Sequence, residues 1–248
     1  MKDVIGFFGG DGQTGTTMIA WSFAEVLSGK GNRVLLIFGS GSDDQTFLPA
    51  ERGRSIDALK AAVRSGRVER DDLLQSLEKR KELWILPGIR NPLTAGQFLE
   101  NTFEILLTSV EEDFDYVVID GGSDVRMGLT VSALSICTRR YFVVTQEAKT
   151  LQRYLKCRNL FFSPLGFDGK LILNQYRKDP ALFLKGDVTR LLETSVDVVI
   201  PYVDGGWLTE MEQRNLLHVS SFGRAVEELI KDYVPEGKKE GVWRKHFT

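Results

Sequence analysis

Residues 3–17 read DVIGFFGGDGQTGTT, and this segment carries the most informative pattern of the sequence. The apolar run over residues 3–8 has the composition of a buried β-strand, and a turn containing Gly10, Gly12 and Gly15 follows it. A helical pattern begins at Thr16, with apolar residues recurring every four positions. A strand, a glycine-rich turn and a helix in this order predict the first unit of an α/β domain, with the turn at the carboxyl edge of a parallel sheet.

The alternation of strand and helix patterns continues along the chain. Apolar runs predict strands over residues 3–8, 33–38, 82–87, 115–120, 140–145, 170–175 and 196–201. Helical patterns cover residues 16–28, 56–65, 71–79, 95–111, 129–136, 151–162 and 222–233. We therefore expect one α/β, Rossmann-like domain over residues 1–234, with a mostly parallel central sheet of about seven strands and helices on both faces. Residues 235–248 are expected to form a flexible basic C-terminal tail.

Composition restricts the classes of function. The 32 basic and 34 acidic residues give a net charge of −2, so no global positive field attracts nucleic acid, and specific nucleic-acid binding is not expected. The chain has only two cysteines and two histidines, which argues against a disulfide framework and against His-based catalytic or metal sites. It shows no signal-peptide pattern and no apolar run of membrane-spanning length, so we expect a cytoplasmic protein.

The turn after the first strand matches the phosphate-binding pattern G-x-x-x-x-G-K-[ST], except that Thr16 stands at the lysine position. Backbone amides of such a loop and of the following helix start converge on an anion. The candidate nucleotide-binding residues of the loop are Gly10, Asp11, Gly12, Gln13, Thr14, Gly15, Thr16 and Thr17. An alternative is a glycine-rich turn that binds nothing. A second register, starting at Gly9 with Gln13 at the lysine position, is disfavoured because it inserts residues between loop and helix.

Two further side chains end predicted strands at the same edge of the sheet. Asp120 ends the apolar run 115–120, where α/β folds bind ligands, although it could instead cap the following loop. Asn174 leaves the run 170–175, and a simple turn-forming role is the alternative.

Together with FDYVVID (114–120), KLILNQY (170–176) and VVIPYVD (198–204), the loop resembles the ParA/MinD branch of P-loop ATPases. The resemblance covers the chain from Lys2 to about Tyr233. It implies Thr17 and Asp120 as ligands of Mg²⁺, Asn174 as an adenine contact, ATP or ADP with Mg²⁺ as the bound nucleotide, and a homodimer.

The chain departs from that family at four positions. Asp11 stands where the signature lysine would be, Thr16 replaces the second lysine, and Phe38 and Ser40 stand where the second strand usually ends in aspartates. Without the two lysines, the charge that develops on the transferred phosphate loses its main side-chain stabilisers, and without the aspartates the site loses groups that position water and metal. We expect ATP hydrolysis to be very slow or absent, and at most weak.

The stretch GTTMIA (15–20), and more loosely the region around residues 184–188, resembles the TadZ/CpaE-like subgroup that localises Flp-type pili. This resemblance implies a spatial organiser for an envelope-associated assembly, such as a pilus or secretion system, with protein partners from that machinery.

The tail interleaves cations with Val242, Trp243 and Phe247. MinD proteins end in a similar basic amphipathic segment, which implies peripheral contact with the inner face of the membrane through these three side chains. A solvated tail is the alternative.

Two other functions stay open. One is an active partition or site-placement ATPase that recruits a substitute cation, for which Lys149 and Arg126 are candidates. The other is a scaffold whose site binds no nucleotide.

Overall fold

A computed structural model describes residues 1, 3–41, 54–206 and 208–233. Within them lies an eight-stranded sheet with the order β3-β4-β2-β5-β1-β6-β7-β8. Its strands are β1 (Asp3–Gly9), β2 (Val34–Phe38), β3 (Glu78–Arg80), β4 (Leu83–Leu86), β5 (Tyr116–Asp120), β6 (Arg139–Val144), β7 (Lys170–Tyr176) and β8 (Val198–Pro201). All neighbouring pairs are parallel except β3 and β4. The predicted fold class, an α/β domain with a mostly parallel sheet, is confirmed.

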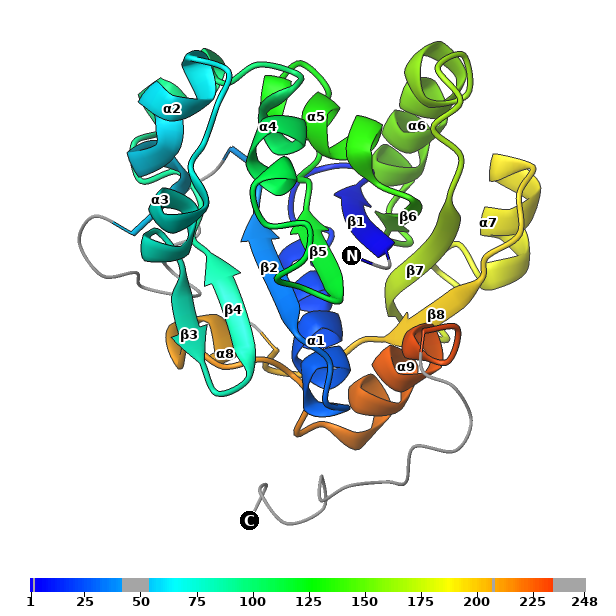
Figure 1. Ribbon diagram of the computed structural model, residues 1–248. Coiled ribbons are helices and arrows are strands. Elements are labelled where there is room, and N and C mark those ends of the chain that lie inside the picture. Colours follow the sequence, from blue (N-terminus) through cyan, green and yellow to red (C-terminus); the bar gives the residue numbers. More distant parts are fainter. Residues whose placement is uncertain (2, 42–53, 207, 234–248) are drawn as a thin grey trace.

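Helices cover both faces of the sheet (Figure 1). They are α1 (Thr16–Gly29), α2 (Lys60–Arg64), α3 (Arg70–Gln75), α4 (Thr102–Thr108), α5 (Gly128–Ile136), α6 (Ala148–Cys157), α7 (Lys185–Leu192), α8 (Leu208–Met211) and α9 (Ser220–Ile230). Helices α1 and α9 pack side by side on one face, and α4, α5 and α6 contribute to the core on the other. Because side chains alternate along each strand, one apolar core forms on each face.

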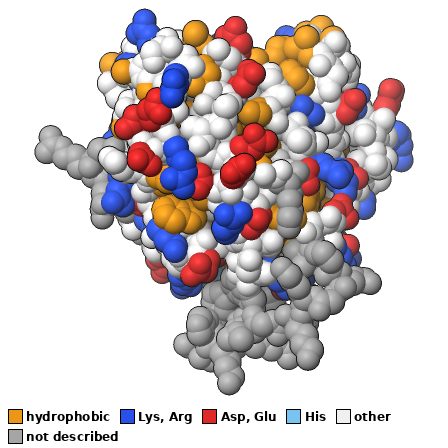
Figure 2. Space-filling view, viewed as in Figure 1, with side chains coloured by type: hydrophobic (Ala, Val, Ile, Leu, Met, Phe, Trp, Pro, Cys, Tyr) orange, Lys and Arg blue, Asp and Glu red, His pale blue; other side chains and the backbone are white. Residues whose placement is uncertain are grey.

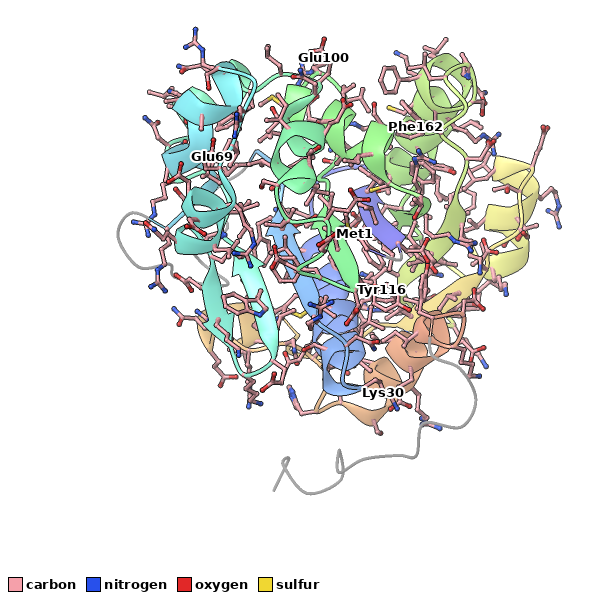
Figure 3. All side chains as sticks on the ribbon, in the orientation of Figure 1. Met1, Lys30, Glu69, Glu100, Tyr116 and Phe162 are labelled. Carbon is pink, nitrogen blue, oxygen red and sulfur yellow. The ribbon has the colours of Figure 1, made fainter. Side chains whose placement is uncertain are left out.

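The end of the described chain is fixed to the α1 face. Tyr116, labelled in Figure 3, donates its hydroxyl to the Tyr233 carbonyl at 2.9 Å. The Tyr141 and Tyr233 hydroxyls lie 3.0 Å apart. Since these contacts join β5 and β6 to the residues that follow α9, the C-terminal helix belongs to the domain core.

The predicted helix over residues 71–79 is wrong at its C-terminal end. The helix stops at Gln75, and Glu78–Arg80 forms β3, which pairs antiparallel with β4. Lys81 takes a left-handed backbone with φ 55° and reverses the chain between the two strands. Pairing with β3 satisfies the backbone hydrogen-bonding groups along the outer side of β4. The sequence did not predict this strand, because its residues, EKR, are charged and lack the apolar pattern of a strand.

Other boundaries differ as well. The predicted helix 95–111 is a 3₁₀ helix, Pro92–Gln97, followed by α4, and the predicted helix 56–65 begins with a 3₁₀ turn, Ile56–Leu59. The predicted helix 151–162 starts three residues earlier as α6 and ends in a π-helical turn, Arg158–Phe162. Helices α7 and α8 were not predicted, because each is short and only weakly apolar.

Candidate functional site

The glycine-rich loop joins the end of β1 to the start of α1 and is anchored at both ends. At its start, the Gly9 and Gly10 amides donate to the Gly122 and Val143 carbonyls at 2.8 and 2.7 Å. At its end, Gly15 precedes α1 with a left-handed backbone, φ 79°, and a Cβ there would lie 2.4 Å from Asn174 Nδ2. Only glycine fits this position, for both reasons. No side chain caps the α1 N-terminus, so its first amides are open to an external acceptor.

Two threonine hydroxyls link the loop internally. Thr14 Oγ1 and Thr16 Oγ1 lie 2.9 Å apart, and Thr14 Oγ1 also donates to the Asp11 carbonyl at 3.3 Å. Both side chains are buried. Thr16, at the lysine position, therefore points into the loop, where its hydroxyl is hydrogen-bonded to Thr14. It supplies no positive charge to a phosphate.

Thr17 and Asp120 meet at the start of α1, 103 residues apart in sequence. The Thr17 hydroxyl donates to Asp120 Oδ2 at 2.5 Å. A hydroxyl and a carboxylate oxygen are both hard ligands of the kind that Mg²⁺ prefers. The two residues predicted to hold Mg²⁺ are thus in direct contact, and their binding of the ion stays a prediction.

Asp120 is completely buried among aromatic side chains. Its neighbours across the sheet are Phe7 on β1 and Phe38 on β2, and both point to the α1 face with it. Burial raises the pKa of Asp120 to about 6, although hydrogen bonds from Thr17 and the Gly122 amide work in the opposite direction. A bound cation would stabilise the carboxylate, which has no cationic partner among those hydrogen bonds.

Asp11 is the charged residue of the loop, and two cationic side chains contact it. Its carboxylate accepts from the Gly12 amide at 2.8 Å and from Arg153 Nη1 at 2.6 Å, and Lys149 Nζ lies 3.3 Å away. Burial alone would raise the pKa of Asp11, but these three partners outweigh it and lower the pKa below its usual value. Two cations from α6 therefore compensate the negative charge of Asp11, which by itself would repel a nucleotide.

Sequence reasoning missed Arg153. Lys149 and Arg153 are four residues apart, a spacing that places both on one face of a helix. That spacing was visible in the sequence, but nothing in it indicated which helix face meets the loop. Lys149, one of the two candidate substitute cations, lies at the loop beside Asp11.

Asn174 lies at the loop from the β7 side. Its Nδ2 donates to the Thr14 carbonyl at 2.7 Å, and the side chain is buried. Beside it, Gln175 Nε2 donates to the Gln13 carbonyl at 3.4 Å. The amide of Asn174 thus supports the loop backbone, and its contact with adenine stays a prediction.

The remaining predicted positions are placed as follows. Phe38 is buried in the core on the α1 face, where it cannot replace an aspartate. Arg126 is bound to Asp124, with Nη2 2.7 Å from Oδ2, and its side chain is 83% exposed. Val242, Trp243 and Phe247 lie outside the described residues. Among the described residues, no group of three or more His, Cys, Asp or Glu side chains could hold a metal ion.

The surface gives no support for a nucleic-acid site on the face shown in Figure 2, where acidic and basic side chains are interspersed. In the part of the chain that the structure describes, no helix is both long and apolar enough to cross a membrane.

Comparison with known proteins gives results at the level of structure. Neither a protein-family model nor a curated protein matches the sequence. Among solved structures, the septum site-determining protein MinD of Pyrococcus horikoshii, complexed with Mg-ADP, is 17% identical with a TM-score of 0.76, covering 94% of this chain and 96% of that one. A ParA family ATPase from Chlorobium tepidum is 18% identical with a TM-score of 0.76, covering 92% and 98%.

A MinC:MinD cell division complex of Aquifex aeolicus is similar to the same extent. It is 18% identical with a TM-score of 0.73, and the match covers 94% of this chain and 98% of that chain. All three matches extend over nearly the whole length of both chains, while the identities are low. The chain therefore has the fold of the MinD and ParA ATPases.

Proposed function

We propose that this protein binds ATP or ADP with Mg²⁺ at the glycine-rich loop and uses the nucleotide to control its assembly, with very weak or no hydrolysis. It would act as a positioning protein of the ParA/MinD type. Nucleotide would serve as a conformational or dimerising ligand, and a homodimer is the form that the family resemblance supports.

The contact between Thr17 and Asp120 carries this proposal. A hydroxyl and a buried carboxylate lie 2.5 Å apart at the start of a helix without a side-chain cap hydrogen bond, and these are groups that suit a Mg-nucleotide. The first amides of α1 suit phosphate oxygens, and no hydrogen bond from a described residue brings a cation to the carboxylate. Thr17 and Asp120 would hold Mg²⁺, and the loop backbone would hold the phosphates.

The charge distribution in the loop argues for slow hydrolysis. Thr16 gives no cation to the transferring phosphate, and its hydroxyl is bound to Thr14. Removing one donor to a developing oxyanion typically costs about 2.7–4 kcal/mol of transition-state stabilisation. Phe38 also replaces a carboxylate that would position water or metal in the related ATPases.

The positioning role and its partners rest on resemblance. The MinD and ParA structures belong to proteins named for septum-site determination and for the ParA family, and one is a complex with MinC. The lysine-free GTT loop end resembles the TadZ/CpaE-like subgroup, which supports an envelope-associated assembly such as a Flp pilus or secretion system as the partner. A fluorescent fusion in the native host should gather at discrete envelope sites, and a uniform distribution would count against this role.

The experiment that tests nucleotide binding is thermal unfolding with millimolar Mg-ATP and Mg-ADP. A ligand that binds only the folded state raises its stability by RT ln(1 + [L]/Kd), about 2.7 kcal/mol at one hundred times Kd. We expect a clear rise in Tm with both nucleotides, and light scattering should show whether the dimer fraction rises with it. Absence of any Tm shift would contradict the proposal and favour a scaffold.

Matched variants locate the binding. Thr17→Val removes the hydroxyl while keeping the shape and should abolish the Mg²⁺-dependent part of the shift. Thr108→Val is the control, because Thr108 is exposed on α4 and its hydroxyl donates to the Glu104 carbonyl of the same helix. Phosphate release that is steady in the wild type and lost in Asp120→Ala would support the alternative of an active ATPase.

A further inference from the structure

The Asp11 carboxylate occupies an anion site that the protein itself has built. Three donors of different kinds converge on it: the Gly12 amide at 2.8 Å, Arg153 Nη1 at 2.6 Å and Lys149 Nζ at 3.3 Å. A backbone amide of a glycine-rich loop, a guanidinium and an ammonium are the groups that bind phosphate in nucleotide sites. Here all three are directed at an internal carboxylate.

The position of α6 relative to the loop is set by close packing. A Cβ on Gly10 would lie 3.0 Å from Val144 Cγ1 and 3.1 Å from Tyr154 Cβ, so the helix approaches the loop backbone directly. Tyr154 and Leu151 are buried under α6 and hold it there. Lys149 and Arg153 are therefore presented to the loop by a packed helix.

The cations are accessible although the carboxylate between them is not. The Asp11 side chain is 9% exposed, whereas those of Arg153 and Lys149 are 41% and 81% exposed. An incoming phosphate can reach both cationic heads from solvent. A polyphosphate also carries more negative charge than one carboxylate, so it can compete for the same donors.

We propose that Lys149 and Arg153 are phosphate-binding residues supplied by α6 in place of the missing loop lysines, and that Asp11 holds them at the loop as an internal substitute anion until nucleotide phosphate takes over its donors. This inference rests on the proposed nucleotide binding and identifies the cations that bind the phosphates. Binding would transfer Arg153, Lys149 and the Gly12 amide from the carboxylate to phosphate oxygens. The α6 cations would thereby distinguish ATP from ADP.

The test compares affinities for Mg-ATP, Mg-ADP and adenosine, taken from Tm shifts or from displacement of a fluorescent ATP. Lys149→Ala combined with Arg153→Ala should weaken Mg-ATP binding at least tenfold, weaken Mg-ADP binding less, and leave adenosine unchanged. Lys149→Ala alone tests the idea with little risk to folding, because that side chain is largely exposed. Arg153→Lys should recover part of the loss.

Lys156→Ala is the matched control, since Lys156 is an exposed cation of the same helix. It should leave the ATP to ADP affinity ratio unchanged. Asp11→Asn should raise the affinity for Mg-ATP several-fold, because the internal competitor loses its charge. If Asp11 has only a structural role, Asp11→Asn should instead lower the Tm measured without nucleotide, and its affinity for Mg-ATP should be unchanged or weaker.

The outcomes separate this inference from the proposed function. If the wild type binds nucleotide but the Lys149 and Arg153 variants keep the wild-type ATP to ADP ratio, the inference is overturned and nucleotide binding stands. If the wild type binds neither Mg-ATP nor Mg-ADP, the proposed function fails and this inference fails with it.

Discussion

The Asp120 carboxylate is completely buried, and the hydrogen bonds it accepts from described residues come from neutral groups. Phe7 and Phe38 flank it on the neighbouring strands, and its hydrogen bonds come from Thr17 and the Gly122 amide. Ionising such a group costs free energy because neutral hydrogen bonds replace water only in part. A bound cation would offset this cost.

This cost predicts an unusual pH dependence. With the pKa of Asp120 raised from 3.8 to about 6, the folded state binds more protons than the unfolded state between these values. Stability without Mg²⁺ should fall as pH rises through that window and stay reduced above pH 6. The Asp120→Asn variant lacks this titration. As pH rises from 4 to 7.5, its free energy of unfolding should therefore increase by about 1–3 kcal/mol relative to that of the wild type, measured by urea unfolding.

Asp113→Asn is the opposite case. The Arg70 hydrogen bond lowers the pKa of Asp113, so this carboxylate stabilises the fold above its unfolded pKa and the contribution is lost as pH falls. The variant should therefore lose stability relative to the wild type at neutral pH and approach it in acid. Parallel pH profiles for both variants would contradict the account of Asp120.

Helix α1 connects the glycine-rich loop to the core. Its Phe23 ring packs edge-on against Phe7, with centroids 5.2 Å apart, and against Tyr233 at 5.4 Å. Phe7 also stacks on Tyr141 at 5.0 Å. This cluster of four rings joins β1, β6, α1 and the chain after α9, so the start of α1 is held rigidly beside Asp120.

Truncating the centre of this cluster should be costly. Phe23 is completely buried, and Phe23→Ala is expected to lower the free energy of unfolding by about 3–5 kcal/mol, measured by urea or thermal unfolding. Leu160→Ala is the control, because Leu160 is 71% exposed and its loss should change stability by less than about 0.5 kcal/mol. Equal effects would show that the ring cluster does not stabilise the fold.

At the scale of the whole molecule, the sheet ends in two protected edges. On one side, β3 is only three residues long and reads EKR. On the other, β8 is four residues long and ends at Pro201, which has no amide hydrogen. Short, charged or proline-containing edge strands resist pairing with other chains. If the protein forms the proposed dimer, we therefore expect the interface to use the face where the glycine-rich loop and the carboxyl ends of the strands lie, and to leave the sheet edges unpaired.

The predicted membrane contact is tested by deletion. Tyr233 is buried against Tyr116 and Tyr141, so removing residues 236–248 should leave Tm unchanged. If Val242, Trp243 and Phe247 insert into lipid, the truncated chain should sediment with anionic liposomes several-fold less than the full chain. A triple substitution of these residues by serine keeps the tail length and serves as the control. An unchanged bound fraction in both variants would rule out the contact.

Local patterns in the sequence determined the fold class and much of the loop. Apolar runs separated by helical periodicity predicted seven of the eight described strands, and the spacing of Gly10, Gly12 and Gly15 predicted the turn, because these are properties of neighbouring residues. The family resemblance predicted that Thr17 and Asp120 act together, and the structure brings the two side chains into contact at the carboxyl edge of the sheet.

The contacts between the loop and the charged side chains of α6 depend on how distant segments pack together. Asp11 and Arg153 are 142 residues apart, and their contact depends on how α6 rotates as it packs on Gly10. The antiparallel strand β3 and the burial of Asp120 between two phenylalanines likewise follow from pairing between distant segments. Such contacts are set by packing of the whole core, so no local pattern encodes them.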